Sequence, residues 1–324
     1  MEKSIMDFSL IKDEREWGIP PDHRVHEDQV YPMASVPSLW HIPKDVFQPI
    51  WDSGITGKGV TISIDDTGVN PHDNLPTPIA SKNFTGSRGG GDVDRHGHGT
   101  HVAGTALGRN GLGAAPEADL IAVKVLSDGG SGSTAGINNG RIWAAEQGAD
   151  IISESLGGGG SSQADKDAID RAYQAGASIC VAAAGNSGYK GRNTIGYPGR
   201  YMTTCCVGAY RKDGSIATFS SGGREIDVAT PGQDIISASN RGGYVSMSGT
   251  SMATPMFSGL MALVIHKRRI SGFPDISGMD QWREFFQNRG FMEDAGDTGK
   301  DNRFGLGKPL IVNILKWLKE PLNI

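Results

Sequence analysis

Short β-branched segments alternate with longer helical ones along most of this chain, and this alternation limits the fold more than any other feature. Strands are predicted at 60–64, 120–126, 150–153 and 178–183, with helices at 134–147 and 165–175. Strands joined by helices pair in parallel through right-handed crossovers. The pattern therefore predicts an α/β fold with a mostly parallel central sheet flanked by helices.

The remainder of the chain reads as one domain with a short extension in front of it. Shorter strands are expected around 204–209, 226–229 and 235–239, and helices after Ser251, at 278–290 and at 309–319. Residues 1–35 are polar and mixed in charge, and we expect them to lie outside the core. We thus divide the chain into an N-terminal extension, 1–35, and a domain, 36–324.

The amino-acid composition limits which binding partners and which cellular compartment can be expected. The 324 residues carry 31 Lys and Arg against 36 Asp and Glu, a net charge of −5. The chain therefore lacks the excess of positive charge that is typical of nucleic-acid-binding proteins. No run is apolar for about 18 residues, so no membrane span is expected. The three cysteines, Cys180, Cys205 and Cys206, lie in apolar runs without disulfide spacing. With no signal peptide at the start, these features favour the cytoplasm, with secretion by another route left open.

Three side chains stand at the ends of predicted elements. Asp66 ends the strand at 60–64, where α/β folds bind their ligands. His98 opens a helix of small residues. Ser251 lies in a run of small residues, 249–255, where another helix begins, so its hydroxyl meets backbone N–H donors.

Together these side chains form a set suited to nucleophilic catalysis. A serine hydroxyl is a weak nucleophile and needs an adjacent base. Histidine is the side chain best suited to that task near neutral pH, and a carboxylate fixes its tautomer. The chain order Asp66, His98, Ser251 matches one of the known orders of such triads.

Four segments now identify a family resemblance. The sequence resembles the subtilisin-like serine proteases, or subtilases, in its segments 64–69, 98–104, 182–186 and 249–255. The resemblance covers about residues 57–265, and more weakly extends to Leu310. It implies the subtilisin-like three-layer fold and a serine endopeptidase that hydrolyses peptide bonds in protein or peptide substrates. It predicts no oligomeric state.

Site roles follow from the resemblance, position by position. It implies Ser251 as the nucleophile, His98 as the general base and acid, and Asp66 as the orienting carboxylate. Asn186 and the backbone N–H of Ser251 are implied as the oxyanion donors. Two segments resemble the edges that clamp the substrate backbone as an added strand. The resemblance also implies the walls of the pocket that receives the side chain before the scissile bond. Edges and pocket walls together give these implied substrate-binding residues: Gly130, Ser131, Gly132, Ser155, Leu156, Gly157, Ala183, Gly185 and Gly196. None of these is charged, so large apolar side chains are expected in that pocket.

Several alternatives remain at the level of sequence. Asp65 competes with Asp66 for the triad, although the family's Asp-Thr-Gly pattern selects Asp66. His96, His98 and His101 have spacings that also suit a metal cluster. Asn186 also fits a simple turn residue.

No cofactor is expected for the chemistry, and calcium is considered only as a structural ion. Asp227 resembles a carboxylate that some relatives use in a weak calcium site, and it is the one metal ligand predicted. The family's stronger calcium loop looks shortened at 105–116, so that site is expected to be absent.

The extension and the activity each carry an alternative. Intracellular members of the family carry a short Pro-containing segment across the active site, and the segment 18–21, with Pro20 and Pro21, offers comparable chemistry. The extension is therefore either an inhibitory pro-segment or a tail with no role. For the domain, the alternatives to a general endopeptidase are a maturation peptidase with one substrate and an inactive subtilase-like binding module.

Overall fold

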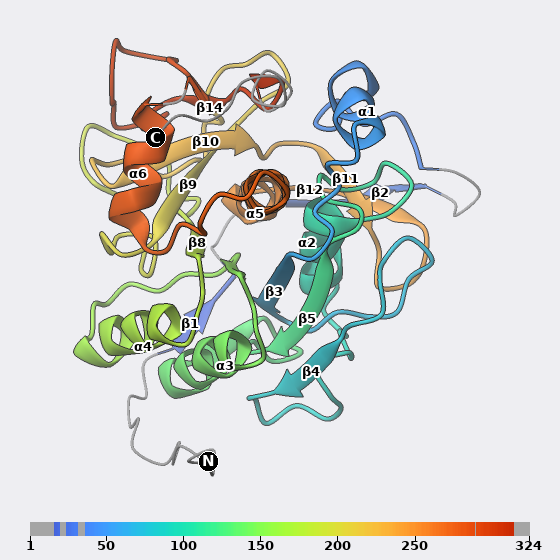
Figure 1. The fold of residues 1–324 in the computed structure, drawn as a ribbon. Coiled ribbons are helices and arrows are strands. Elements are labelled where there is room, and N and C mark those ends of the chain that lie inside the picture. Colours follow the sequence, from blue (N-terminus) through green and yellow to red (C-terminus); the bar gives the residue numbers. More distant parts are fainter. Residues whose placement is uncertain (1–15, 20–23, 32–35, 289, 314–324) are drawn as a thin grey trace.

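A seven-stranded parallel sheet forms the centre of the computed structural model (Figure 1). The structure describes residues 16–19, 24–31, 36–288 and 290–313. In spatial order the strands are β10 (Ile226–Pro231), β9 (Cys205–Tyr210), β8 (Ile179–Ala183), β7 (Ile151–Glu154), β3 (Thr61–Asp66), β5 (Asp119–Lys124) and β4 (Ala80–Asn83). Every neighbouring pair is parallel, which confirms the predicted fold class. All seven strands therefore end at the same edge of the sheet.

Helices cover both faces of this sheet. The helices α2 (His98–Leu107) and α5 (Thr250–Ile270) pack on one face, and α3 (Thr134–Glu146) and α4 (Gln163–Gln174) on the other (Figure 1). Alternate residues of β5 divide between the layers, with Leu120 in the core cluster of α2 and α5 and Ile121 in that of α3. The strands are buried on both faces, as their continuous apolar runs predict.

The two helices that carry His98 and Ser251 in their first turns, α2 and α5, approach each other closely. A side chain at Gly259 of α5 would clash with the backbone of Ala106 in α2. Residues 252–265 of α5 are buried on all sides, so the helix is anchored in the core beside the sheet. This packing holds the starts of α2 and α5 near the carboxyl ends of the strands.

Smaller elements surround the central layers. The strands β11 (Ile235–Ala238), β12 (Tyr244–Ser248) and β2 (Arg24–Tyr31) form an antiparallel sheet. Two further antiparallel pairs are β1 (Glu16–Gly18) with β6 (Ser131–Ser133) and β13 (Met292–Glu293) with β14 (Lys308–Pro309). The remaining helices are α1 (Lys44–Asp52) and α6 (Met279–Asn288).

Two expectations about the chain ends are corrected. The helix predicted at 309–319 is wrong at its start, because 308–309 form β14 and the Leu310 N–H bonds Phe291 O at 2.7 Å; residues 314–319 lie outside the described part. The extension was expected to lie outside the core, yet Trp17 is only 3% exposed. A lone tryptophan in a polar stretch carries no periodic pattern, and it is buried here by docking onto another segment.

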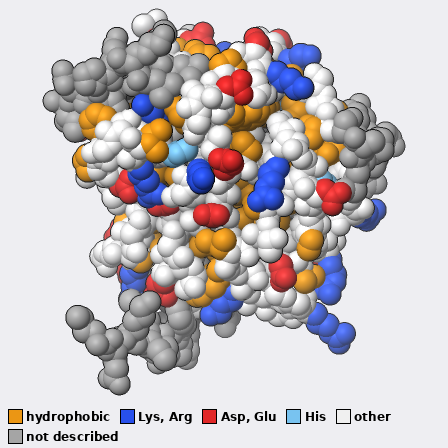
Figure 2. Space-filling view, turned by 45° about the vertical axis from the view of Figure 1, so that its right-hand side comes forward, with side chains coloured by type: hydrophobic (Ala, Val, Ile, Leu, Met, Phe, Trp, Pro, Cys, Tyr) orange, Lys and Arg blue, Asp and Glu red, His pale blue; other side chains and the backbone are white. Residues whose placement is uncertain are grey.

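The surface shows no gathering of charge on the face in view. Among the described residues of that face, acidic and basic side chains are interspersed with apolar and uncharged ones (Figure 2). Within the described ranges, no helix combines the length and apolarity needed to cross a bilayer.

Candidate active site

The carboxylate of Asp66 and the imidazole of His98 form a buried hydrogen-bonded pair. The strand β3 ends at Asp66, and α2 begins with His98. The Nδ1 atom of His98 lies 2.8 Å from Asp66 Oδ1 and 3.0 Å from Oδ2, and both side chains are fully buried. A side chain at Gly99 would clash with Gly68 O and lie 3.2 Å from Asp66 Cβ. The glycine therefore allows the first turn of α2 to sit against the end of β3.

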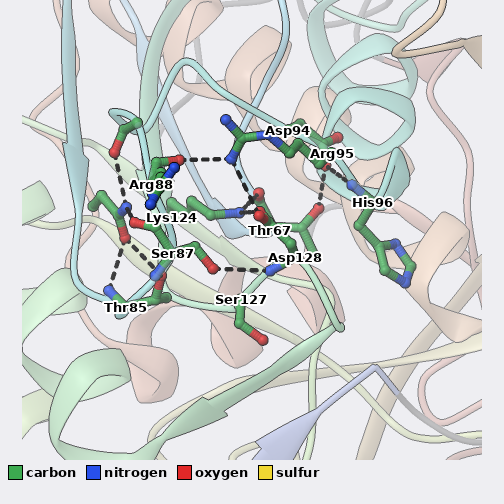
Figure 3. A network of polar contacts seen from close by, with 12 residues as sticks. Thr67, Thr85, Ser87, Arg88, Asp94, Arg95, His96, Lys124, Ser127 and Asp128 are labelled. Atoms are coloured by element: carbon green, nitrogen blue, oxygen red, sulfur yellow. Dashed lines mark hydrogen bonds and ion pairs between the residues drawn. The ribbon is translucent and has the colours of Figure 1, made fainter.

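A second carboxylate, Asp94, fixes the loop that leads into α2 (Figure 3). Its Oδ1 accepts hydrogen bonds from Thr67 Oγ1 at 2.9 Å and from the Gly97 N–H at 2.8 Å, and its Oδ2 accepts from the Thr100 N–H at 2.9 Å. Asp94 thus ties the residue after Asp66 to the helix that carries His98. The sequence prediction missed this residue, although an acidic side chain just before a helix start is a capping signal.

Behind this loop lies a buried cation (Figure 3). Lys124, at the end of β5, is fully buried; its ammonium donates to Thr67 O and lies 3.0 Å from Asp128 Oδ1. Arg95 pairs with the other oxygen of Asp128 at 3.1 Å. The hydrogen bond from Lys124 holds the pKa of Asp128 below its ordinary value. This network supports the backbone that follows Asp66.

Ser251 and Asn186 meet at the start of α5. The hydroxyl of Ser251 lies 3.2 Å from Ser155 O, and Ser155 Oγ donates to Ser251 O at 2.7 Å. Asn186 Oδ1 accepts from the Thr250 N–H at 2.9 Å and from Thr250 Oγ1 at 3.0 Å, which fixes the orientation of the amide. Asn186 Nδ2 is buried and has no acceptor among the described residues.

An unused buried donor is costly, so its presence points to a ligand that supplies the acceptor. A side chain at Gly249 would lie 3.3 Å from Asn186 Nδ2. Glycine at that position keeps the space beside the amide open. The arrangement offers a hydrogen bond to a group that enters next to Ser251.

The predicted substrate-binding residues fall into two groups around this centre. Gly130, Ser131 and Gly132 face β1, where Ser131 pairs with Gly18 and Gly132 with Trp17. Gly157 exchanges two backbone hydrogen bonds with Gly18, at 3.1 and 2.9 Å. The segment 16–19 therefore lies between the two edges as an added strand.

The second group comes from the loops after β7 and β8. The Gly196 N–H bonds Ala184 O at 3.1 Å, between the predicted residues Ala183 and Gly185. A side chain at Gly196 would lie 3.4 Å from Gly158 O, next to Gly157. The structure thus brings the segments of Ser155, Leu156 and Gly157, of Ala183 and Gly185, and of Gly196 side by side.

The geometry at Asp227 does not fit the calcium ligand predicted there. Arg283 donates to both of its carboxylate oxygens, at 2.8 and 3.1 Å, and Lys300 Nζ lies 3.7 Å away. The Cys206 N–H also donates to Oδ2, at 3.0 Å. Arg283 and Lys300 therefore already balance the charge of this carboxylate. Sequence reasoning missed the pair because Arg283 lies 56 residues further along the chain, in α6.

The three histidines do not converge on one point. His98 bonds Asp66, whereas His101 Nε2 lies 2.9 Å from Ile235 O, and the ring of His96 lies 6.2 Å from that of His98. Across the described ranges, no group of three His, Cys, Asp or Glu side chains is arranged to hold a metal ion.

Asp65, the other carboxylate at this strand end, faces a different environment. It is fully buried and accepts a hydrogen bond from the hydroxyl of Ser63. Within the described residues, the hydrogen bond of His98 Nδ1 goes to Asp66 and not to Asp65. Burial, reinforced by the nearby carboxylate of Glu154, raises the pKa of Asp65 to about 8. Asp65 therefore carries a proton at neutral pH.

Comparison with known proteins agrees with this architecture. The family model described as the subtilase family matches residues 57–307. Subtilisin DY of Bacillus licheniformis is 41% identical over 219 residues, which cover 66% of this chain and 79% of that protein. Subtilisin E of Bacillus subtilis (strain 168) is 39% identical over 271 residues, 82% of this chain and 69% of that protein. Alkaline elastase YaB of Bacillus sp. (strain YaB) is 38% identical over 289 residues, which cover 87% of this chain and 71% of that protein.

The fold and these matches define a hydrolase of the serine protease class. The chain belongs to the subtilase family and is a serine endopeptidase.

Proposed function

We propose that this endopeptidase cleaves peptide bonds through Asp66, His98 and Ser251. The observation that carries the proposal is the buried hydrogen bond between His98 Nδ1 and Asp66. Because the Nδ1–H of the imidazole donates a hydrogen bond to the carboxylate, Nε2 is left unprotonated and can act as the base for the Ser251 hydroxyl. The imidazolium that forms then donates its proton to the leaving amine, while Asp66 stabilises its charge.

Asn186 is the proposed side-chain donor to the tetrahedral oxyanion. Its amide is oriented through Thr250, at the start of the same helix that carries Ser251, and its Nδ2 is buried without an acceptor among the described residues. A donor held rigidly in a dry site stabilises charge as it develops, without reorganising. The Ser251 N–H, at the N-terminus of α5, is the second donor.

Replacing Asn186 with leucine should lower kcat by about 10²- to 10³-fold with little change in KM, the range known for loss of this donor in a subtilisin. The reason is that the amide acts on charge that exists only in the transition state. Steady-state kinetics on a small peptide substrate measure both constants. An effect confined to KM would assign Asn186 to ground-state binding and contradict the proposal.

The substrate backbone is proposed to add as a strand between Gly130–Gly132 and Ser155–Gly157. Support comes from β1, whose backbone makes such bonds with both edges. The predicted wall residues beyond it, Ala183, Gly185 and Gly196, are small and uncharged. We therefore expect a preference for large apolar side chains before the scissile bond.

The N-terminal extension is proposed to inhibit the enzyme by occupying this strand position. Besides the bonds of Gly18, the Ile19 N–H bonds Gly130 O at 3.1 Å. A second strand of the extension, β2, pairs with β12, whose Ser248 lies three residues before Ser251. Tethering gives the segment a high local concentration, so even weak contacts exclude substrate. Pro20 and Pro21 lie outside the described residues.

Deleting residues 1–30 should raise the initial rate on a small peptide substrate, and the full-length enzyme should show a lag that the deleted form lacks. Gly18→Pro, which removes the N–H bonded to Gly157 O, should shorten the lag in the full chain. Progress curves with simultaneous mass spectrometry of the extension provide the measurement. Equal initial rates and no lag in both forms would show that the extension is a tail without this role.

The compartment is proposed to be reducing, as in the cytoplasm. Cys180, Cys205 and Cys206 are free and buried, and burial raises the pKa of each thiol. Such cysteines act as small apolar core residues and need no oxidising environment.

A further inference from the structure

Two acidic side chains lie beside each other at the ends of β3 and β7. These strands pair in parallel with Ile64 opposite Ser153, so the next residues along them, Asp65 and Glu154, occupy neighbouring positions. Side chains alternate between the faces of a sheet, and both residues lie on the face that α3 covers, where Arg141 donates to Glu154 Oε1 at 3.0 Å. Both acidic side chains are fully buried.

Each of the two carboxyl groups has one oxygen with a donor and one without. The hydroxyl of Ser63 donates to Asp65 Oδ1, and Arg141 donates to Glu154 Oε1. Asp65 Oδ2 and Glu154 Oε2 are buried and have no donor among the described residues. Two unsatisfied buried acceptors are costly, whereas one proton on Asp65 turns an acceptor into a donor for the other group. The geometry therefore fits a proton held between the two oxygens.

The charges around the pair also favour one retained proton. Arg141 is the cation that faces it, and its guanidinium already pairs with Glu154 at 2.8 Å. The residue of β5 opposite Asp65 is Val123, which is uncharged. Burial raises the pKa of the Cys180 thiol to about 12, so this group adds no charge near neutral pH. The other titratable side chains whose charges act on the pair are Asp66 on β3 and Asp165 on α4.

The pair stands between two parts of the proposed catalytic centre. Next to Asp65 on β3 is Asp66, which bonds His98. Next to Glu154 on β7 is Ser155, whose carbonyl lies 3.2 Å from Ser251 Oγ and whose hydroxyl donates to Ser251 O at 2.7 Å. The paired part of β3 and β7 reaches Ile64 and Ser153, so the two carboxyl groups add a link beyond it.

We propose that Asp65 and Glu154 are positioning residues, which share one proton and thereby hold the strand end that carries Asp66 against the strand end that carries Ser155. The inference rests on the proposed catalytic roles of Asp66, His98 and Ser251. When solvent removes the proton, two buried anions repel each other and the strand ends separate. His98 is then misaligned with Ser251, and kcat falls.

The test is the dependence of kcat on pH, measured on an uncharged peptide substrate blocked at both ends. The full-length enzyme is taken after its activity has reached a plateau. We expect the wild-type kcat to fall about tenfold from pH 7 to pH 9, because Asp65 loses one proton with a pKa of about 8. Recovery of the rate on return to pH 7, and an unchanged circular dichroism spectrum at pH 9, separate this fall from unfolding.

Two variants assign the fall. The amide of Asp65→Asn can donate to Glu154 and accept from Ser63 at every pH, so its kcat should stay within a few-fold of wild type at pH 7 and show no fall up to pH 9. Cys180→Ala is the matched control, since it removes a nearby buried titratable group of another kind, and it should keep the fall.

Infrared difference spectra of wild type against Asp65→Asn give a second measurement. The C=O stretch of a protonated carboxyl group should be present at pH 7 and should disappear with the same midpoint as kcat. Absence of this band at pH 7 would overturn the proposal, as would an equal fall of kcat in Asp65→Asn or a constant wild-type kcat while the band disappears. Failure of the proposed triad is distinguishable, because it would appear as hydrolysis by Ser251→Ala and would leave the infrared band unchanged.

Discussion

Replacing Ser251 with alanine is expected to abolish peptide hydrolysis, with a fall in kcat of about 10⁶-fold, as measured when the triad serine of a subtilisin is removed. In the proposed mechanism the serine hydroxyl is the nucleophile that forms the acyl-enzyme, and alanine has no group that can replace it. The fold should persist, because alanine suits a helix and the serine side chain loses only its contact with Ser155 O. Hydrolysis of a fluorogenic peptide, followed over hours, covers the required range.

The same helix supplies a matched control. Ser258 is also fully buried in α5, and its hydroxyl bonds Ser153 Oγ at 2.8 Å. Ser258→Ala removes a buried hydroxyl of equal size away from the proposed triad, so it should retain activity within a few-fold. Residual hydrolysis by Ser251→Ala above about a thousandth of wild type would contradict the role of Ser251, because binding and oxyanion donors alone supply no more.

The neighbouring carboxylates of Asp66 and Asp65 provide the second prediction with a large effect on activity and its control. Asp66→Asn should lower kcat by about 10⁴-fold, because an amide no longer holds His98 in the required tautomer or stabilises the imidazolium. Asp65→Asn should leave activity within a few-fold, since Asp65 is already protonated at neutral pH and contacts Ser63. Comparable losses from the two substitutions would contradict the assignment of Asp66.

The stability of the Asp65 variant provides an independent reading. The pKa of Asp65 is about 8 in the folded chain, against an ordinary value of 3.8. Between about pH 4 and 8 the folded chain keeps a proton that the unfolded chain has released. The free energy of unfolding therefore falls as pH rises, by at most about 1.4 kcal/mol per unit from this group.

Asp65→Asn removes this slope, so its stability relative to wild type should increase from pH 5 to pH 7.5. Urea denaturation at the two pH values measures the difference. An equal difference at both would mean that Asp65 is not buried as an acid.

The sequence predicted the elements that carry chemistry, because their signals are local. The strand that ends at Asp66 and the helices whose first turns carry His98 and Ser251 are each visible within about ten residues, and parallel pairing of the strands places these segments at one edge of the sheet. Four segments that resemble a family pattern, in a fixed order, then suggested the site. The structure adds the distance between His98 and Asp66, and the bonds that orient Asn186.

The features that were missed depend on contacts between distant segments. The carboxylate of Asp227 is balanced by Arg283, and a motif-based reading of Asp227 alone suggested a metal instead. Trp17 is buried against a helix more than a hundred residues away, through its bond to Thr134. Neither pairing leaves a periodic or spaced signal in the sequence, so each requires the tertiary structure.

Covalent labelling with a fluorophosphonate tests the central claim most directly. The full-length enzyme, taken after its activity has reached a plateau, is treated with the probe, digested and mapped by mass spectrometry. The account predicts one phosphonylated residue, Ser251, with loss of hydrolysis in proportion to labelling, and no labelling in Ser251→Ala. Labelling of another residue in parallel with inactivation, or full activity after Ser251 is modified, would contradict it.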